Sequence, residues 1–119
     1  TVVTAVEPDS QHPNHPPLQV NLQRLQAMCT QDGDSLRVIE LPMPEPVLDQ
    51  GERLPASYAN FYIGNRTVLM PAFGQSRDAD AQAILQQCFP SRRVLPLDST
   101  DLIRGLGSFH CLTQQEPWG

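Results

Sequence analysis

Proline is the residue that most constrains how this chain can fold. The sequence contains 12 prolines in 119 residues, and most of them lie in the segments 8–17 and 42–55. Proline lacks a backbone N–H and pushes the preceding residue out of the helical region. Both segments are therefore predicted to be loops, and regular structure is confined to the stretches around them.

Hydrophobic spacing in those stretches predicts alternating strands and helices. One helical stripe begins at Leu18 and ends at Cys29, and another begins at Ala81 and ends at Cys88. Gly64-Asn65 is typical of a hairpin turn. The expected helices run from Pro17 to Asp32-Gly33 and over 76–89, with a capped turn at 99–103, and the expected strands cover 2–6, 36–41, 57–63, 67–70, 93–97 and 108–112. This order predicts an α/β fold in which one strand–helix–strand unit is imperfectly repeated.

Charge and cysteine usage exclude several classes of partner. The net charge is −5, whereas nucleic acids and anionic membranes bind basic surfaces. The sequence has no run of 18 apolar residues that would predict a membrane span, and its first residues do not lead us to expect a signal peptide. The 3 scattered cysteines do not form a disulfide framework, which favours a reducing, cytoplasmic location.

The paired histidines of the first loop are not predicted to bind a metal. His12 and His15 lie three residues apart, but flanking prolines oppose a helix that would align their rings, and no further ligand lies nearby. We expect both to be solvated loop residues. No metal or cofactor is expected from this sequence.

The three cysteines have different predicted roles. Cys29 and Cys88 lie on apolar helical stripes, where cysteine acts as a small hydrophobic residue. Cys111 follows Gly105 and Gly107, which allow close backbone approach. Spacing alone leaves Cys111 open between a nucleophile and a core strand residue. On a strand, neighbouring His110 would face the opposite side and could not easily serve as its base.

Several motifs resemble one enzyme family. They are LPASYANFYIGN (54–65), VLMPAFG (68–74), FPSRRV (89–94) and GLGSFHCLTQQEP (105–117), with TVVTAVEPD (1–9) and LPMPEP (41–46) fitting the same pattern. Together they resemble the C-terminal part of agmatine deiminase and its relatives, the Porphyromonas-type peptidylarginine deiminase family of the pentein (guanidine-modifying) superfamily. The chain departs from the family's Gly-Gly-Asn step at Leu106-Gly107-Ser108.

The resemblance implies a fold and a domain organisation. The family fold is a five-module α/β propeller around a substrate channel. Residues 1–53 are then expected to form part of the penultimate module, with its Pro-rich loops, and residues 54–119 the final module, with the Cys loop. Missing N-terminal modules of the same protein would complete the site.

The resemblance also implies a hydrolase of linear amidines. Cys111 would be the nucleophile, and a small cationic guanidino compound such as agmatine would be the substrate. Gly105 and Gly107 would either lie on the substrate side of the loop or simply form a turn. Peptidylarginine or arginine is the alternative substrate, and a non-catalytic interaction module is the alternative class.

The remaining catalytic groups are expected outside this chain. The family's acid/base histidine lies in a His-x-Asp motif, which none of the chain's 3 histidines matches. The chain alone is therefore expected to be inactive. Asn60 is expected to satisfy a backbone group rather than face the channel, Asp98 and Asp101 to be cap or loop acids, and Trp118 to pack near the chain end or be disordered.

Overall fold

The computed structural model describes residues 1–116. It divides into two compact units, one comprising Thr1–Met43 and the other the chain from Pro44 onward. This boundary lies N-terminal to the predicted one between residues 53 and 54. The assignment of the two segments to propeller modules stays a prediction.

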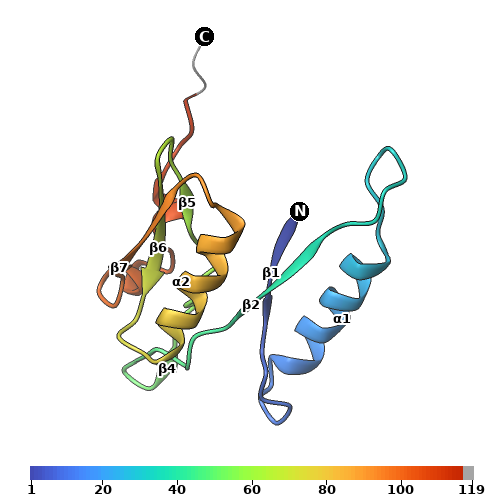
Figure 1. Cartoon of the computed structure of the whole chain (residues 1–119). Coiled ribbons are helices and arrows are strands. Elements are labelled where there is room, and N and C mark those ends of the chain that lie inside the picture. The colour runs from blue at the N-terminus through green and yellow to red at the C-terminus, as the bar shows by residue number, and fades with distance from the viewer. Residues whose placement is uncertain (117–119) are drawn as a thin grey trace. The chain divides into compact units, whose positions relative to one another are not determined.

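The first unit is a parallel strand–helix–strand arrangement (Figure 1). Strand β1 (Val2–Val6) pairs with β2 (Val38–Pro42), and helix α1 (His15–Ala27) connects them. Leu22 is the buried residue of the helix, and the side chain of Asn21 donates a hydrogen bond of 3.0 Å to Thr4 Oγ1. The strands and the helix predicted for this segment are confirmed, with shifted ends.

Helix α1 begins before the predicted position. His15 is its first residue, and Pro16 and Pro17 occupy the first turn, where the missing N–H groups have no intrahelical acceptor to lose. Nδ1 of His15 lies 2.6 Å from the carbonyl oxygen of Glu7, which fixes the ring against the end of β1. The prediction of a solvated loop residue is therefore wrong for His15.

Helix α1 also ends early, so the prediction for Cys29 is wrong. The backbone becomes extended at Met28, and Cys29 pairs with Ser35 in an isolated antiparallel bridge. The chain reverses between them through Gly33, whose φ is +88°. Turn chemistry here outweighs the hydrophobic spacing, and it leaves Cys29 exposed rather than buried on the helix.

The second unit contains a mixed sheet with strand order β5-β6-β7. Strand β5 (Tyr62–Ile63) is antiparallel to β6 (Thr67–Ala72), and β6 is parallel to β7 (Arg93–Asp98) across helix α2 (Arg77–Cys88). The hairpin at Gly64-Asn65 and the helix predicted at 76–89 are confirmed. The repeated strand–helix–strand pattern is present as β1-α1-β2 and β6-α2-β7.

The core of the second unit lies where α2 meets the sheet (Figure 1). Ala81 and Leu85 are fully buried on α2, as the stripe predicted, and Val68 and Met70 are fully buried on β6. Burial of a Val, Leu or Met side chain stabilises the fold by about 1.5–3 kcal/mol, and burial of the smaller Ala81 side chain stabilises it by less.

A small hairpin interrupts the second Pro-rich loop. Strands β3 (Leu48–Asp49) and β4 (Glu52–Arg53) pair antiparallel, with Gln50 and Gly51 at positive φ between them. The prediction of unbroken loop over 42–55 is therefore wrong at this hairpin, because the turn residues allow local pairing between the prolines.

The outer edge of β7 is occupied by helix α2. Gln86 accepts a hydrogen bond from the Val94 N–H at 3.0 Å and donates to the Arg92 carbonyl at 2.8 Å, and Gln82 donates to the Val94 carbonyl at 3.2 Å. Pro96 has no N–H to offer a further strand. Strand β7 lies at an edge of the sheet, where a proline is tolerated.

Residues 57–63 do not form the long strand that their aromatic content predicts. Only Tyr62–Ile63 pairs with β6. Ser57 instead begins a turn, in which its carbonyl accepts from the Asn60 N–H at 3.2 Å and its hydroxyl accepts from the Ala59 N–H at 3.2 Å. The turn buries Tyr58 completely, and this burial outweighs strand propensity.

Residues 108–112 are helical, and the strand predicted there is wrong. After the 3₁₀ helix η1 (Leu102–Gly105), which agrees with the predicted short turn, Phe109–Leu112 forms the single-turn helix α3. The Leu112 N–H donates to the Ser108 carbonyl at 3.2 Å. The His110 N–H donates to the Asn60 carbonyl at 3.3 Å, so this segment bonds to the 57–60 turn and to itself rather than extending the sheet.

Candidate functional site

The thiol of Cys111 is held by the side chain of Asn60. Asn60 Nδ2 donates to Cys111 Sγ at 3.0 Å, and Asn60 Oδ1 accepts from the Cys111 backbone N–H at 3.3 Å. The Asn60 carbonyl also accepts from the His110 N–H at 3.3 Å. The turn at 57–60 and helix α3 therefore form one hydrogen-bonded site.

This environment favours the thiolate. The Asn60 amide, followed by the backbone N–H of Ser108, lowers the pKa of Cys111 below its ordinary value. Cys111 is exposed, so burial does little to oppose the charge. An accessible thiol with a lowered pKa is the arrangement that nucleophilic cysteines require. Sequence spacing left Cys111 open between a nucleophile and a core strand residue. Its exposure and its hydrogen bond to Asn60 favour the nucleophile.

The two predicted glycines differ in their surroundings. A Cβ on Gly107 would lie 2.9 Å from Cys111 Cβ and 3.2 Å from Cys111 Sγ, so the absent side chain makes room for the thiol. A Cβ on Gly105 would meet nothing within 4 Å. Close approach is therefore present at Gly107, whereas Gly105 has no neighbour that requires a glycine.

The unusual backbone angle of this loop falls on Leu106, between the glycines. Its φ is +64°, in the left-handed region that favours glycine, and its side chain is 70% exposed. Leu106 is one of the two positions, with Ser108, at which the chain departs from the Gly-Gly-Asn step of the family that it resembles. The sequence thus places a strained residue next to the glycine that contacts Cys111.

His110 and Cys111 are neighbours on one helical turn rather than on opposite faces of a strand. Within residues 1–116, the His110 ring makes no hydrogen bond or ion pair with Cys111. The ring instead lines a cavity of about 510 Å³ together with Phe61, Tyr62 and the segment 113–115. The structure thus gives His110 no contact through which it could activate the thiol.

A buried tyrosine supports the turn that carries Asn60. The hydroxyl of Tyr58 donates to Asp78 Oδ1 at 2.6 Å, and burial, followed by this bond, raises the pKa of Tyr58 above its ordinary value. Asp78 also accepts from the backbone N–H groups of Phe73 and Gln75. One carboxylate therefore joins the start of α2 to the Asn60 turn.

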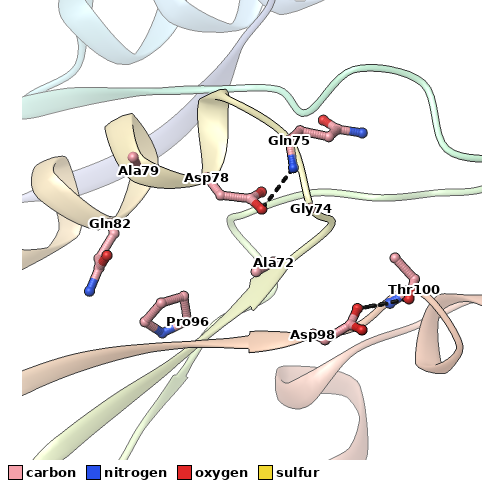
Figure 2. Close-up of a pocket in the computed structure, with 9 residues that line it drawn as sticks. All are labelled: Ala72, Gly74, Gln75, Asp78, Ala79, Gln82, Pro96, Asp98 and Thr100. Carbon is pink, nitrogen blue, oxygen red and sulfur yellow. Dashed lines mark hydrogen bonds between the residues drawn. The ribbon is translucent and has the colours of Figure 1, made fainter.

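A second cavity, of about 550 Å³, lies along α2 and the end of β7 (Figure 2). Its acidic lining residues already have partners, because Asp78 binds the Gln75 N–H and Asp98 accepts from Thr100. The Thr100 bonds lower the pKa of Asp98. Cys111 does not line this cavity. These bonds make Asp98 a turn acid at the end of β7, which agrees with the loop alternative of the prediction.

The other candidate residues do not join the site. Asp101 occupies the N-cap position of η1 without a side-chain cap bond, and Trp118 lies outside the described residues. Cys88 is half-buried at the end of α2, and Cys29, Cys88 and Cys111 are all free thiols. Sequence spacing missed the contact between Asn60 and Cys111, whose only local signal was a polar residue between aromatic ones.

The described part of the chain shows neither a metal-binding cluster nor a membrane-spanning helix. Residues 1–116 contain no group of three or more His, Cys, Asp or Glu side chains placed to hold a metal ion. None of the helices in that same range is long and apolar enough to cross a bilayer.

Known proteins share this sequence and fold. A protein of Selenomonas ruminantium is 38% identical over 98% of the chain, which is 36% of that protein. Agmatine deiminase of Pseudomonas fluorescens is 36% identical over 98% of the chain and 36% of its own length. The structure of agmatine deiminase of Enterococcus faecalis superposes with a TM-score of 0.89 at 27% identity, covering 97% of this chain and 36% of that one.

The chain thus spans about a third of the length of these relatives. The model of one family, the Porphyromonas-type peptidyl-arginine deiminases, matches residues 1–117. With an α/β fold shared by its structural relatives and a sequence match over almost its whole length, the chain belongs to the Porphyromonas-type peptidyl-arginine deiminase family.

Proposed function

We propose that this chain carries the nucleophile of a guanidine deiminase whose substrate is agmatine. The observation that carries the proposal is the exposed Cys111 thiol, whose pKa is lowered by the Asn60 amide. The similarity to proteins named agmatine deiminase over 98% of the chain supports the choice of substrate. The net charge of −5 is compatible with a cationic substrate.

The proposed reaction uses the thiolate to split one difficult hydrolysis into two steps. Cys111 Sγ attacks the central guanidinium carbon, a C–S bond forms, and one C–N bond breaks as ammonia leaves with a proton from a general acid. Water, deprotonated by the same group, then attacks the amidino carbon. The C–S bond breaks, and the thiolate and N-carbamoylputrescine are released.

The other catalytic groups are proposed to lie in a longer protein that includes this chain. A planar guanidinium is best held by carboxylates that accept its N–H groups in pairs. The proposed acid/base histidine and carboxylates lie in modules preceding residue 1. Residues 1–53 then belong to the penultimate module of a five-module propeller, and residues 54–119 form the last. The 119-residue chain alone is expected to be inactive.

Ammonia release and N-carbamoylputrescine formation test this proposal. The protein encoded by the longest reading frame that includes this chain is expected to hydrolyse agmatine, and Cys111→Ala is expected to abolish turnover. Retained activity in Cys111→Ala would overturn the role of the thiol. Assays with arginine and an arginine-containing peptide distinguish agmatine from the substrates of other family members. An unreactive Cys111 would favour a non-catalytic interaction module.

A further inference from the structure

Two buried serines connect the sheet to the helix that carries Cys111. Ser99 and Ser108 are both fully buried, and the Ser108 hydroxyl donates to Ser99 Oγ at 3.3 Å. The Ser99 hydroxyl in turn donates to the Leu97 carbonyl at 3.2 Å, while its backbone N–H donates to the Ala72 carbonyl at 2.9 Å. Ser99 is thus fixed to the sheet through both its backbone and its side chain.

Ser108 is the residue from which α3 begins. It is the N-cap of the helix, but its side chain points to Ser99 and makes no cap bond within α3. Its carbonyl accepts the Leu112 N–H, which closes the single turn containing Cys111. A helix of 4 residues has little stability of its own. Its position therefore depends on its outside contacts, which are those of Asn60 and those that hold Ser108.

The first part of the segment between the two serines is bonded to Ser99, because the Ile103 N–H donates to the Ser99 carbonyl at 2.9 Å, whereas its last part is exposed. Ile103 is buried, but Gly105 and Leu106 are exposed, and Leu106 has left-handed backbone angles. A displacement of Ser108 would also move Gly107, which has no space to spare beside the Cys111 thiol. The serine pair joins the two ends of this loop directly and bypasses its exposed part.

We propose that Ser99 and Ser108 are positioning residues for Cys111, because their buried hydroxyl pair fixes the backbone of Ser108 and with it the turn that presents the thiol. This inference rests on the proposed function of Cys111 as the nucleophile. Independent support comes from the Ser108 backbone N–H, which is the second cause, after Asn60, that lowers the pKa of the thiol. Removal of either hydroxyl also leaves the other buried hydroxyl without its hydrogen-bond partner. This costs free energy, which a rearrangement of the loop would recover.

The test is the pH profile of Cys111 alkylation by iodoacetamide in the 119-residue chain, followed by peptide mass spectrometry. Ser99→Ala, Ser108→Ala and the double variant are compared with wild type, and exposed Ser91→Ala is the matched control. Both single variants are expected to move the Cys111 midpoint to higher pH and to slow alkylation several-fold below it. The double variant is expected to shift no further than the larger single variant.

The alkylation rate of half-buried Cys88, which lies in the same unit, reports unfolding of that unit and is expected to stay unchanged. An unchanged Cys111 profile in the single variants, or additive shifts in the double variant, would overturn the proposal. Either single variant suffices if the other fails to fold. Because alkylation requires no substrate, this result is separate from the proposed function, which fails instead if Cys111→Ala retains deiminase activity.

Discussion

Asn60 binds both the thiol and the backbone N–H of Cys111, although the two residues are 51 positions apart in the chain. The side-chain amide of Asn60 links the turn at 57–60 to helix α3. Its NH₂ group donates to the sulfur, and its oxygen accepts from the backbone N–H. Asparagine can do both because its side chain carries one donor group and one acceptor. These two hydrogen bonds fix the position of Cys111, and the bond to the sulfur lowers the pKa of its thiol.

Replacing Asn60 is expected to make the thiol less reactive. Asn60→Ala removes the first cause of the lowered Cys111 pKa, so the pKa should rise and the thiolate fraction at neutral pH should fall. Alkylation at pH 7 should slow several-fold, and the midpoint of its pH profile should move upward. Asn65→Ala, at the exposed hairpin turn, is the control. An unshifted profile in Asn60→Ala would contradict the role of the amide.

The two glycines near Cys111 are expected to respond differently to alanine. Gly107→Ala places a Cβ 2.9 Å from Cys111 Cβ, so the thiol must move and alkylation should slow. Gly105→Ala meets nothing within 4 Å and should leave the alkylation rate unchanged. Rate measurements on both variants check this pair, and equal effects at the two positions would contradict the structure.

Relief of the strain at Leu106 is expected to stabilise the second unit. Leu106→Gly removes a left-handed leucine that is 70% exposed and so loses little packing. The left-handed conformation costs about 1–2 kcal/mol, part of which the entropy of glycine cancels, so a net gain of up to about 1 kcal/mol is expected. Urea unfolding measures it. A lower midpoint in the variant would show that Leu106 makes contacts that the structure lacks.

Tyr58 is expected to make stability fall in alkaline solution. Burial raises its pKa in the folded chain, so its stabilising contribution is present below the unfolded tyrosine pKa of about 10 and is lost as pH rises further. Tyr58→Phe should cost about 1–2 kcal/mol at pH 7, because Asp78 loses a partner, yet weaken the loss above about pH 10. Thermal unfolding from pH 7 to 11 checks both effects, and Tyr62→Phe controls for the other tyrosine. An identical alkaline slope in wild type and Tyr58→Phe would count against the buried phenol.

The elements that repeat hydrophobic residues over a long stretch could be predicted from the sequence. Helix α2 and its buried Ala81 and Leu85 follow directly from spacing, as do β6 and the hairpin turn at Gly64-Asn65. The short elements could not be predicted in the same way. Residues 108–112 carry the composition of a strand, but their backbone bonds to the distant Asn60 and closes a single helical turn on Ser108.

The sequence was enough to propose Cys111 as the central residue of the candidate site, but not to predict the residues that contact it. The motif around Cys111 identified the thiol by resemblance. The Asn60 contact depends on a turn that replaces a predicted strand, and the choice between Gly105 and Gly107 depends on which one faces the sulfur. Such contacts join segments that are far apart in the chain, so they cannot be predicted from the spacing of neighbouring residues.

Covalent trapping tests the central claim, that Cys111 is the nucleophile, most directly. The protein that contains this chain is treated with 2-chloroacetamidine, which carries an amidinium like the substrate, and the labelled cysteines are mapped by mass spectrometry. The account predicts an adduct on Cys111, prevented by excess agmatine, with far slower labelling of Cys88 and of Cys29, although Cys29 is also exposed. Equal labelling of all three cysteines, or labelling of Cys111 that agmatine does not slow, would contradict it.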